Sequence, residues 1–210
     1  MGTRPMRPVT ACLVVLLPSL GGCGWLIPAH HQTADLAELR PGAYRLDPEH
    51  STILWKVDHL GYSTFVGRFD RYDATLDFDP AHPEASVLEV RVETGSIDTH
   101  LPGFADTLKG ASWLDAEAYP EARFVSRSIT VTGERSGEVV GDLTLLGVTR
   151  PLTLDVVFNG GATNFVTGRF TLGFAASAVI DRTAFGMTSL APAIGGEVTL
   201  EIHAEFLAGG

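Results

Sequence analysis

Three histidines lie where predicted strands give way to turns, and their side chains could bind a metal or transfer protons. His50 and His59 flank one predicted strand, and His100 begins a segment with helical spacing. Imidazole titrates near neutral pH and is a common metal ligand. No carboxylate or cysteine spacing accompanies these histidines. We therefore expect no metal site and interpret His50 as a turn residue whose side chain satisfies backbone groups.

A nucleophilic triad is the second chemistry to consider. Asp47, His50 and Ser51 supply the three residue types of such a triad within five positions. Triads are recognised by geometry, however, and the chain carries no nucleophile-elbow pattern. We therefore assign no catalytic residue. An acid or base histidine acting on a bound ligand is the alternative that this reading leaves open.

Arg182 is a better candidate for a polar contact with a ligand. It precedes Phe185-Gly186-Met187 in an irregular stretch between two predicted strands. A guanidinium group at that position could donate hydrogen bonds to a carbonyl or phosphate oxygen of a ligand. A surface ion pair with Asp181 or another carboxylate is at least as good an interpretation of the same residues.

The first residues read as a targeting segment. Arg4 and Arg7 form a short basic region before an apolar run, Val9–Leu20, that is too short to span a bilayer comfortably. The run ends in Leu20-Gly21-Gly22-Cys23, which resembles a bacterial lipobox. This resemblance implies a lipoprotein signal peptide at residues 1–22, lipidation of Cys23, and a lipidated N-terminus and tether at 23–42. An ordinary secretory signal with a chance cysteine is the alternative.

Strand patterns begin after the predicted tether and continue almost to the last residue. Apolar and polar side chains alternate with a period of two, which is typical of strands with one dry face. A change of phase near Asp70 to Asp73 predicts a bulge or corner. Arg127 fits poorly into its own apolar pattern. The alternating stretches include 53–57, 65–79, 88–92, 124–131, 141–158, 170–178 and 198–206.

One stretch breaks this pattern. Phe104, Leu108 and Ala111 fall at helical spacing, which predicts a short helix near 103–112. We count about eight strands joined by short turns, and closure into a barrel removes exposed sheet edges. The predicted fold is therefore all-β: an antiparallel barrel of about eight strands with a short helical insertion, spanning 43–208. Eight strands leave an interior for side chains or one slim ligand.

Four segments of the chain hold short motifs in a fixed order: Tyr44–Asp47 with His50-Ser51; His59–Gly61 with Gly67–Phe69; Ser112–Asp115, Tyr119-Pro120 and Phe124, joined to Gly141–Pro151; and Ile180–Met187. These motifs and their order resemble the YceI-like family, whose members are envelope proteins that bind polyisoprenoid lipids in a lipocalin-like barrel. Ala184 departs from the family pattern, which often has an acidic residue there.

The resemblance implies an isoprenoid lipid, a quinone or a polyprenyl lipid, inside an apolar lumen. Burial of such a tail is favourable by about 0.8 kcal/mol per methylene-sized group. Each candidate lining residue could equally be plain core. The candidates are Trp55, Phe65, Phe69, Phe78, Leu108, Phe124, Leu143, Leu145, Phe170 and Phe174, with Arg182 for polar contacts.

The sequence thus predicts a non-catalytic lipoprotein that binds or carries an isoprenoid lipid, with no cofactor. It would be anchored at the periplasmic face of the bacterial envelope, at the outer membrane because Gly24 follows the predicted lipidation site. The formal charge of −10 excludes nucleic-acid binding, because phosphates repel an acidic surface. A stress-related interaction module with a filled core is another alternative, and homodimer formation is left open.

Overall fold

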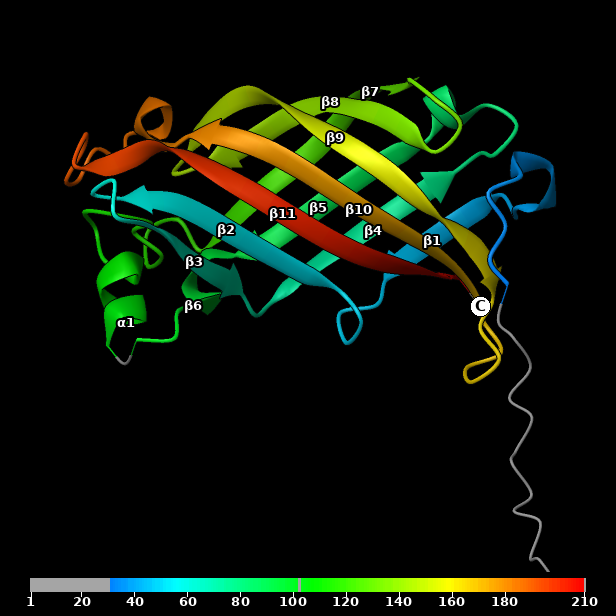
Figure 1. The fold of residues 1–210 in the computed structure, drawn as a ribbon, viewed down its shortest axis with the longest axis horizontal. Helices are drawn as coiled ribbons and strands as arrows, with labels where there is room; N and C mark the ends of the chain where they lie inside the picture. Colours follow the sequence, from blue (N-terminus) through cyan, green and yellow to red (C-terminus); the bar gives the residue numbers. More distant parts are fainter. Residues whose placement is uncertain (1–30, 102, 210) are drawn as a thin grey trace, which may run out of the picture.

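The computed structural model describes residues 31–101 and 103–209, which form one antiparallel sheet with a single α-helix at one end (Figure 1). The predicted signal peptide and Cys23 lie outside the described residues. The strands are β1 Gly42–Leu46, β2 Thr52–His59, β3 Ser63–Phe69, β4 Tyr72–Phe78, β5 Val87–Glu93, β6 Ile97–Asp98, β7 Glu121–Val131, β8 Ser136–Leu145, β9 Val148–Thr163, β10 Phe170–Asp181 and β11 Ile194–Ala208. The helix α1 is Phe104–Lys109, and the 3-10 turns are η1 Leu36–Glu38, η2 Pro83–Ala85, η3 Thr94–Ser96 and η4 Arg182–Phe185.

The sheet closes into a barrel of eight strand positions. Its order is β1-β4-β5-β7-β8-β9-β10-β11, and β1 pairs back with β11 through Leu46 and Phe206. The first half of β11 pairs with β2, which pairs with β3 and then β6. β1 with β2, β3 with β4, and β5 with β6 therefore each share one position, interrupted by a turn. The predicted eight-stranded antiparallel barrel is confirmed.

The interruptions follow from local sequence. β3 ends at Phe69 and β4 begins at Tyr72, where the change of phase predicted a corner. Arg127 lies at a bulge, because the pairing of β7 with β8 shifts register between Ser126 and Ser128. A bulge turns one side chain out of the alternation, which explains why Arg127 fitted the apolar pattern poorly.

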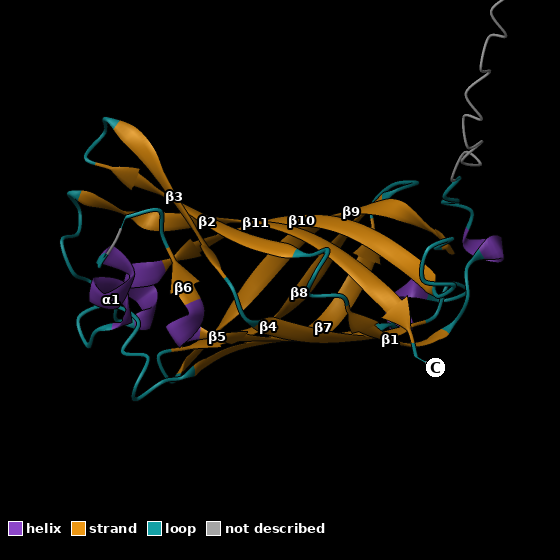
Figure 2. Ribbon diagram, turned by 90° about the horizontal axis from the view of Figure 1, so that it is seen from below, coloured by secondary structure: helices purple, strands orange, loops and turns teal. Residues whose placement is uncertain are grey.

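The two ends of the barrel differ, as the perpendicular view makes clear (Figure 2). At the helix end, α1 and the segment up to residue 120 lie beside β6, and the β8–β9 turn and η4 are nearby (Figure 1). At the terminal end lie η1, η2, the β7–β8 turn and the C-terminus. The helix is shorter than the predicted 103–112. Gly110 ends it, and Leu108 and Leu114 are buried against the barrel.

Part of the expected tether lies against the terminal end. Thr33 forms an isolated bridge with Gly161, and Leu39 is buried in the core near Phe170. The guanidinium carbon of Arg40 is 4.7 Å from the centre of the Phe170 ring. These contacts hold residues 33–40 against the terminal end of the barrel. Within the described residues, no helix has the length and apolar character needed to cross a membrane.

Candidate functional site: two apolar chambers in the barrel

The inward-facing side chains leave two separate hollows inside the barrel. The first, which we call the helix chamber, has a volume of about 270 Å³ and lies between α1 and the sheet. Its walls are almost wholly apolar and carry several aromatic rings. Its lining includes Ile53, Trp55, Phe65, Leu108, Trp113, Leu143, Arg182, Leu190 and Leu200.

Aromatic stacking builds one wall of the helix chamber. The rings of Trp55 and Phe65 stack with centroids 5.7 Å apart, and the His100 ring stacks on Phe65 at 5.4 Å. Phe104 of α1 meets Phe65 edge-on at 5.4 Å. Such pairs contribute about 0.5–1.5 kcal/mol beyond their area. The wall that joins the helix to β2 and β3 is therefore firmly packed.

Gly67 gives the indole of Trp55 its place in this wall. A Cβ atom at Gly67, which pairs with Trp55 across β2 and β3, would lie 2.2 Å from Cζ2 of Trp55. Any side chain there would collide with the ring. Nε1 of Trp55 is the one buried side-chain polar atom without a hydrogen-bond partner among the described residues. It is therefore a donor without an acceptor beside the helix chamber.

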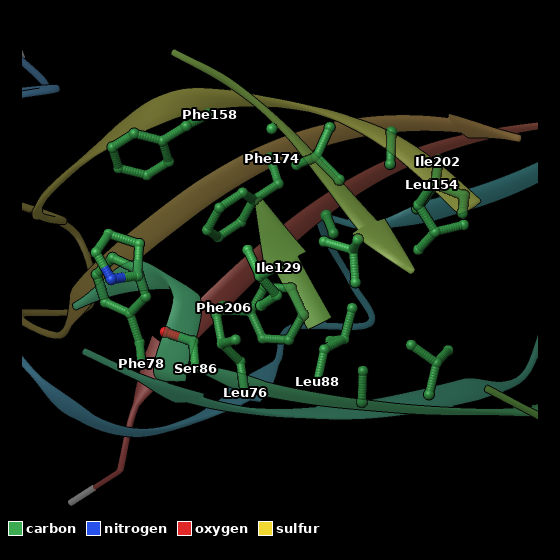
Figure 3. Close-up of a pocket in the computed structure, with 18 of the residues that line it drawn as sticks. Leu76, Phe78, Ser86, Leu88, Ile129, Leu154, Phe158, Phe174, Ile202 and Phe206 are labelled. Atoms are coloured by element: carbon green, nitrogen blue, oxygen red, sulfur yellow. The ribbon is translucent and has the colours of Figure 1, made fainter. Parts of the chain in front are cut away.

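The second hollow, the terminal chamber, has a volume of about 200 Å³ and lies towards the terminal end. Figure 3 shows side chains from several strands, including the rings of Phe158, Phe174 and Phe206, converging on it. The Phe174 ring meets Phe206 edge-on at 5.9 Å. The β7–β8 turn, with Glu134 and Arg135, forms part of its rim. Arg135 is engaged, because its Nε donates to the carbonyl of Phe158 at 3.1 Å.

Arg182 is a buried cation in the wall of the helix chamber. Its Nε and Nη2 donate to the carbonyls of Gly195 and Ile194, each at 2.9 Å, and Nη1 donates to Met187 O at 2.6 Å. Burial lowers the pKa of the guanidinium, and the nearby charge of Asp181 opposes that shift. Its ordinary pKa is so high that the group stays charged. Arg182 thus fastens η4 to the start of β11.

Asp181 does not form the ion pair that the sequence left open. Its Oδ1 accepts hydrogen bonds from the amide of Thr183 at 2.9 Å and from its hydroxyl at 2.6 Å. These bonds lower the pKa of Asp181. Asp181 is the N-cap of η4, and its side chain is engaged in that role.

Eight of the ten predicted apolar lining residues line one of the two chambers. Phe78 and Phe174 line the terminal chamber. Phe170 lines neither chamber and packs in the core at the terminal end. Phe124 also lines neither, because it lies between the two. Those that line the helix chamber, together with Arg182, are Trp55, Phe65, Phe69, Leu108, Leu143 and Leu145.

Sequence reasoning missed several lining residues because they are smaller or lie in turns. Ile53 lines both chambers, and Leu190 lines the helix chamber although 67% of its surface is exposed. Leu190 therefore stands at the mouth. Ile53 was in a predicted apolar face and could have been chosen by alternation alone. Leu190 sits in an irregular loop, where no periodic signal exists.

The histidines do not form a common site. His50 precedes β2 and His59 ends it, so the eight residues of this strand separate them by more than 20 Å at about 3.3 Å per residue. His59 and His100 flank the Phe65 ring at the helix end. His50 and His59 therefore lie at opposite ends of β2 and cannot act on the same group.

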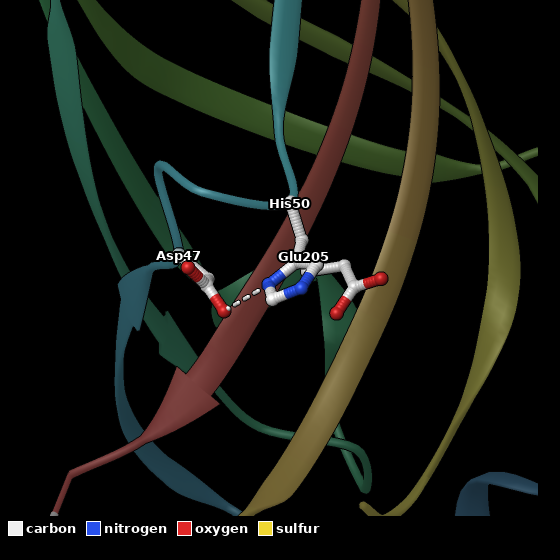
Figure 4. A group of neighbouring side chains, drawn as sticks. All are labelled: Asp47, His50 and Glu205. Atoms are coloured by element: carbon white, nitrogen blue, oxygen red, sulfur yellow. Dashed lines mark hydrogen bonds and ion pairs between the residues drawn. The ribbon is translucent and has the colours of Figure 1, made fainter. Parts of the chain in front are cut away.

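His50 belongs instead to a small polar cluster with Asp47 and Glu205 on the outside of the barrel (Figure 4). His50 Nδ1 lies 2.8 Å from Asp47 Oδ2, and the potential ligand atoms of the three residues lie within 4.8 Å of one another. The Asp47 hydrogen bond raises the pKa of His50, as do the nearby carboxylates of Glu205 and Glu49.

The cluster does not contain a triad. Ser51 Oγ accepts a hydrogen bond from the Glu205 amide at 3.0 Å, and no bond joins Ser51 to His50 among the described residues. A nucleophile needs its base within hydrogen-bond reach. The arrangement closes the β1–β2 turn against β11. His50 is therefore a turn residue, but its side chain bonds the Asp47 carboxylate and not, as expected, backbone groups; Asp47 Oδ1 accepts from the Glu49 amide at 3.1 Å.

Comparison with known proteins gives consistent matches. The sequence matches the family described as the YceI-like domain over residues 44–206. A UPF0312 protein of Pseudomonas putida is 38% identical over 146 residues, which cover 69% of this chain and 76% of the relative. A UPF0312 protein of Pseudomonas savastanoi pv. phaseolicola is 37% identical over 151 residues, covering 71% and 78%.

Solved structures share the fold. Burkholderia cenocepacia BcnA superposes with a TM-score of 0.70 at 24% identity, covering 76% of this chain and 98% of the other. The YCEI protein of Campylobacter jejuni gives 0.63 at 26% identity, covering 73% and 90%. A polyisoprenoid binding domain from Saccharophagus degradans, implicated in plant cell wall breakdown, gives 0.59 at 12% identity, covering 81% and 100%.

Proposed function

The chain belongs to the YceI-like family, and from this premise we propose that it binds an isoprenoid lipid, a quinone or a polyprenyl lipid, inside its barrel. The observation that carries the proposal is the pair of apolar chambers along the lumen. Apolar walls suit a hydrocarbon tail, because burial stabilises the complex by about 0.8 kcal/mol per methylene-sized group. The similar fold of a polyisoprenoid binding domain supports the same ligand class.

Binding without chemical turnover is the simplest role for this lumen. Among the described residues, Arg182 is the one charged side chain in the wall of the helix chamber, and its three bonds hold backbone carbonyls. His59 and Thr94 are other polar lining residues, and Thr94 Oγ1 donates to Tyr119 O at 2.7 Å. A general acid or base must reach the atom it protonates or deprotonates. Among the described residues, the lining of the helix chamber holds one histidine, His59, and no carboxylate that could act with it as an acid–base pair. We therefore propose that the protein binds or carries its lipid and is not an enzyme.

A place in the bacterial envelope follows from the lipobox-like Leu20–Cys23 and remains part of the proposal. A lipid anchor would hold the barrel near the membrane that supplies an insoluble ligand. Metabolic labelling with a palmitate analogue tests this part separately. Label that persists in a Cys23→Ser variant would contradict acylation at that residue.

The lipid itself is tested by extraction. Protein purified from its native envelope is expected to release a prenyl lipid into organic solvent, detected by mass spectrometry at close to one molecule per chain. Ala176→Phe places a ring in the terminal chamber, whereas Ala175→Phe, its neighbour on β10, points the other way. We expect the first variant to lose long-tailed lipid and the second to retain it. An empty extract from the parent protein would contradict the proposal.

A further inference from the structure

The two chambers meet at one level of the barrel and share a single lining residue, Ile53. On β5 and β11, neighbouring inward positions line different chambers at this level. On β11, Ile202 lines the terminal chamber and Leu200 the helix chamber; on β5, Val90 and Val92 divide in the same way. The lumen is therefore one tunnel interrupted by a short packed section.

Phe124 fills that packed section. On β7, Ala122 lines the helix chamber and Ile129 the terminal chamber, whereas Phe124 between them lines neither and is 6% exposed. It packs with Leu143 and Leu154 in the middle cluster of the core. Three buried residues of that cluster line neither chamber: Phe124, Ala178 and Phe185.

Small residues stand at this level on β8, which pairs with β7, and on β10. A Cβ atom at Gly141 on β8 would lie 2.4 Å from Cζ of Phe124, so the ring occupies the space that a side chain would take. On β10, Ala178 lies between Ala176 of the terminal chamber and Ile180 of the helix chamber. The Phe124 ring thus lies over Gly141 in the packed section between the two chambers.

The chamber volumes show what the division means for a ligand. About 200 and about 270 Å³ are each below the roughly 300–1,000 Å³ of typical small-molecule pockets, and only the two together fall within that range. A short tail fits on one side of Phe124. A long tail must pass it and displace the ring.

We propose that Phe124 determines ligand length specificity: its ring divides the lumen into two compartments for short tails and must swing aside for a long one. This inference rests on the proposed binding of isoprenoid lipids. When no long tail is bound, the ring keeps the middle of the barrel at the packing density of a protein interior. When a tail passes, its methyl and methylene groups replace the contacts of the ring.

The test compares prenyl alcohols of increasing length, farnesol, geranylgeraniol and the long polyprenol solanesol, in the parent chain and in Phe124→Leu and Phe124→Ala. We expect the variants to bind solanesol about 10-fold more tightly, because no ring must be displaced, and farnesol within about twofold of the parent value. Native mass spectrometry is expected to show two farnesol molecules but one solanesol molecule on the parent chain.

Phe174→Leu is the matched control, because Phe174 lines the terminal chamber away from the division. This variant should not bind solanesol more tightly relative to farnesol than the parent chain does. Phe124→Leu removes the ring but keeps a smaller branched apolar side chain, so it provides a folded variant if Phe124→Ala unfolds. Equal length profiles in the parent chain and the Phe124 variants would overturn the inference alone. Failure of the parent chain to bind any of the three alcohols would overturn the proposed function as well.

Discussion

The guanidinium of Arg182 lies 5.3 Å from the centre of the Trp113 ring in the wall of the helix chamber. The contact joins η4 to the segment that follows α1, two parts of the chain that approach the helix end from different strands. A cation above an aromatic face is stabilised by about 0.5–2 kcal/mol, more when water is excluded. With its three carbonyl partners, Arg182 organises the mouth of this chamber.

Arg182→Met is therefore expected to lower the free energy of unfolding by about 2–4 kcal/mol, because the carbonyls of Met187, Ile194 and Gly195 lose their donor. Urea denaturation measures this loss. Arg182→Lys keeps the charge but cannot reproduce the planar fork, so its stability should lie between those of the parent chain and the Met variant. A Met variant as stable as the parent chain would contradict this assignment.

Gly67→Ala is expected to lower the free energy of unfolding by about 1–3 kcal/mol, because overpacking forces neighbouring groups to shift. Its Cβ would meet the Trp55 ring at 2.2 Å and the Asp98 carbonyl at 2.8 Å. The matched control is Gly95→Ala, whose Cβ would find only the Ala116 Cβ at 3.9 Å. Thermal unfolding of both variants measures the difference in stability. Similar melting temperatures would contradict the expected cost and show that the Trp55 ring can shift to accommodate the added methyl group.

The fold was predictable because alternation identifies which side chains face inward. Trp55 and Phe78 occupy inward positions of strands whose limits are given by turns, so both were chosen correctly as inward-facing residues. Alternation does not indicate the position of each inward-facing residue along the barrel axis. That position depends on strand tilt and register, which is why Phe124 could not be distinguished from the true lining residues by sequence.

Contacts between distant segments were equally hidden. Glu205 joins Asp47 and His50 only because Leu46 pairs with Phe206 when β1 closes the barrel against β11. The partners of Arg182 are backbone carbonyls, which no side-chain pattern can indicate. From the sequence we expected Asp181 as a partner of Arg182, because neighbours along the chain are the only contacts that a sequence displays directly.

Glu89 is expected to stabilise the barrel down to low pH. Hydrogen bonds from Arg123 and Arg91 lower its pKa to about 2. Because the folded pKa is depressed, the stabilisation is present above the ordinary glutamate pKa, about 4.3, and is lost as the pH falls through about 2. Glu89→Gln should therefore unfold more readily than the parent chain at pH 6, with the difference shrinking in acid. A difference independent of pH would contradict this role.

His50 should show the opposite dependence on pH. Its hydrogen bond to Asp47 raises its pKa above the ordinary value of about 6.5. The stabilisation is therefore present below that value and is lost as the pH rises through the folded-state pKa. NMR titration should give a lower His50 pKa in Asp47→Asn, which keeps an oxygen for the Glu49 amide. An unchanged titration in that variant would show that Asp47 does not hold the imidazolium.

Trp55→Phe tests whether the free indole donor serves the ligand. Nε1 has no acceptor among the described residues, and a buried donor without a partner costs about 1–3 kcal/mol. Nε1 is buried in the wall, so an oxygen of the ligand head group would relieve that cost once the indole turns toward the chamber. We therefore expect Trp55→Phe to weaken binding of a prenyl alcohol by about 2- to 10-fold, as the loss of one hydrogen bond requires. Squalene, a hydrocarbon of the same class without a head group, should bind both forms equally. Equal weakening for both lipids would mean that the ring contributes packing and that its N–H does not contact the ligand.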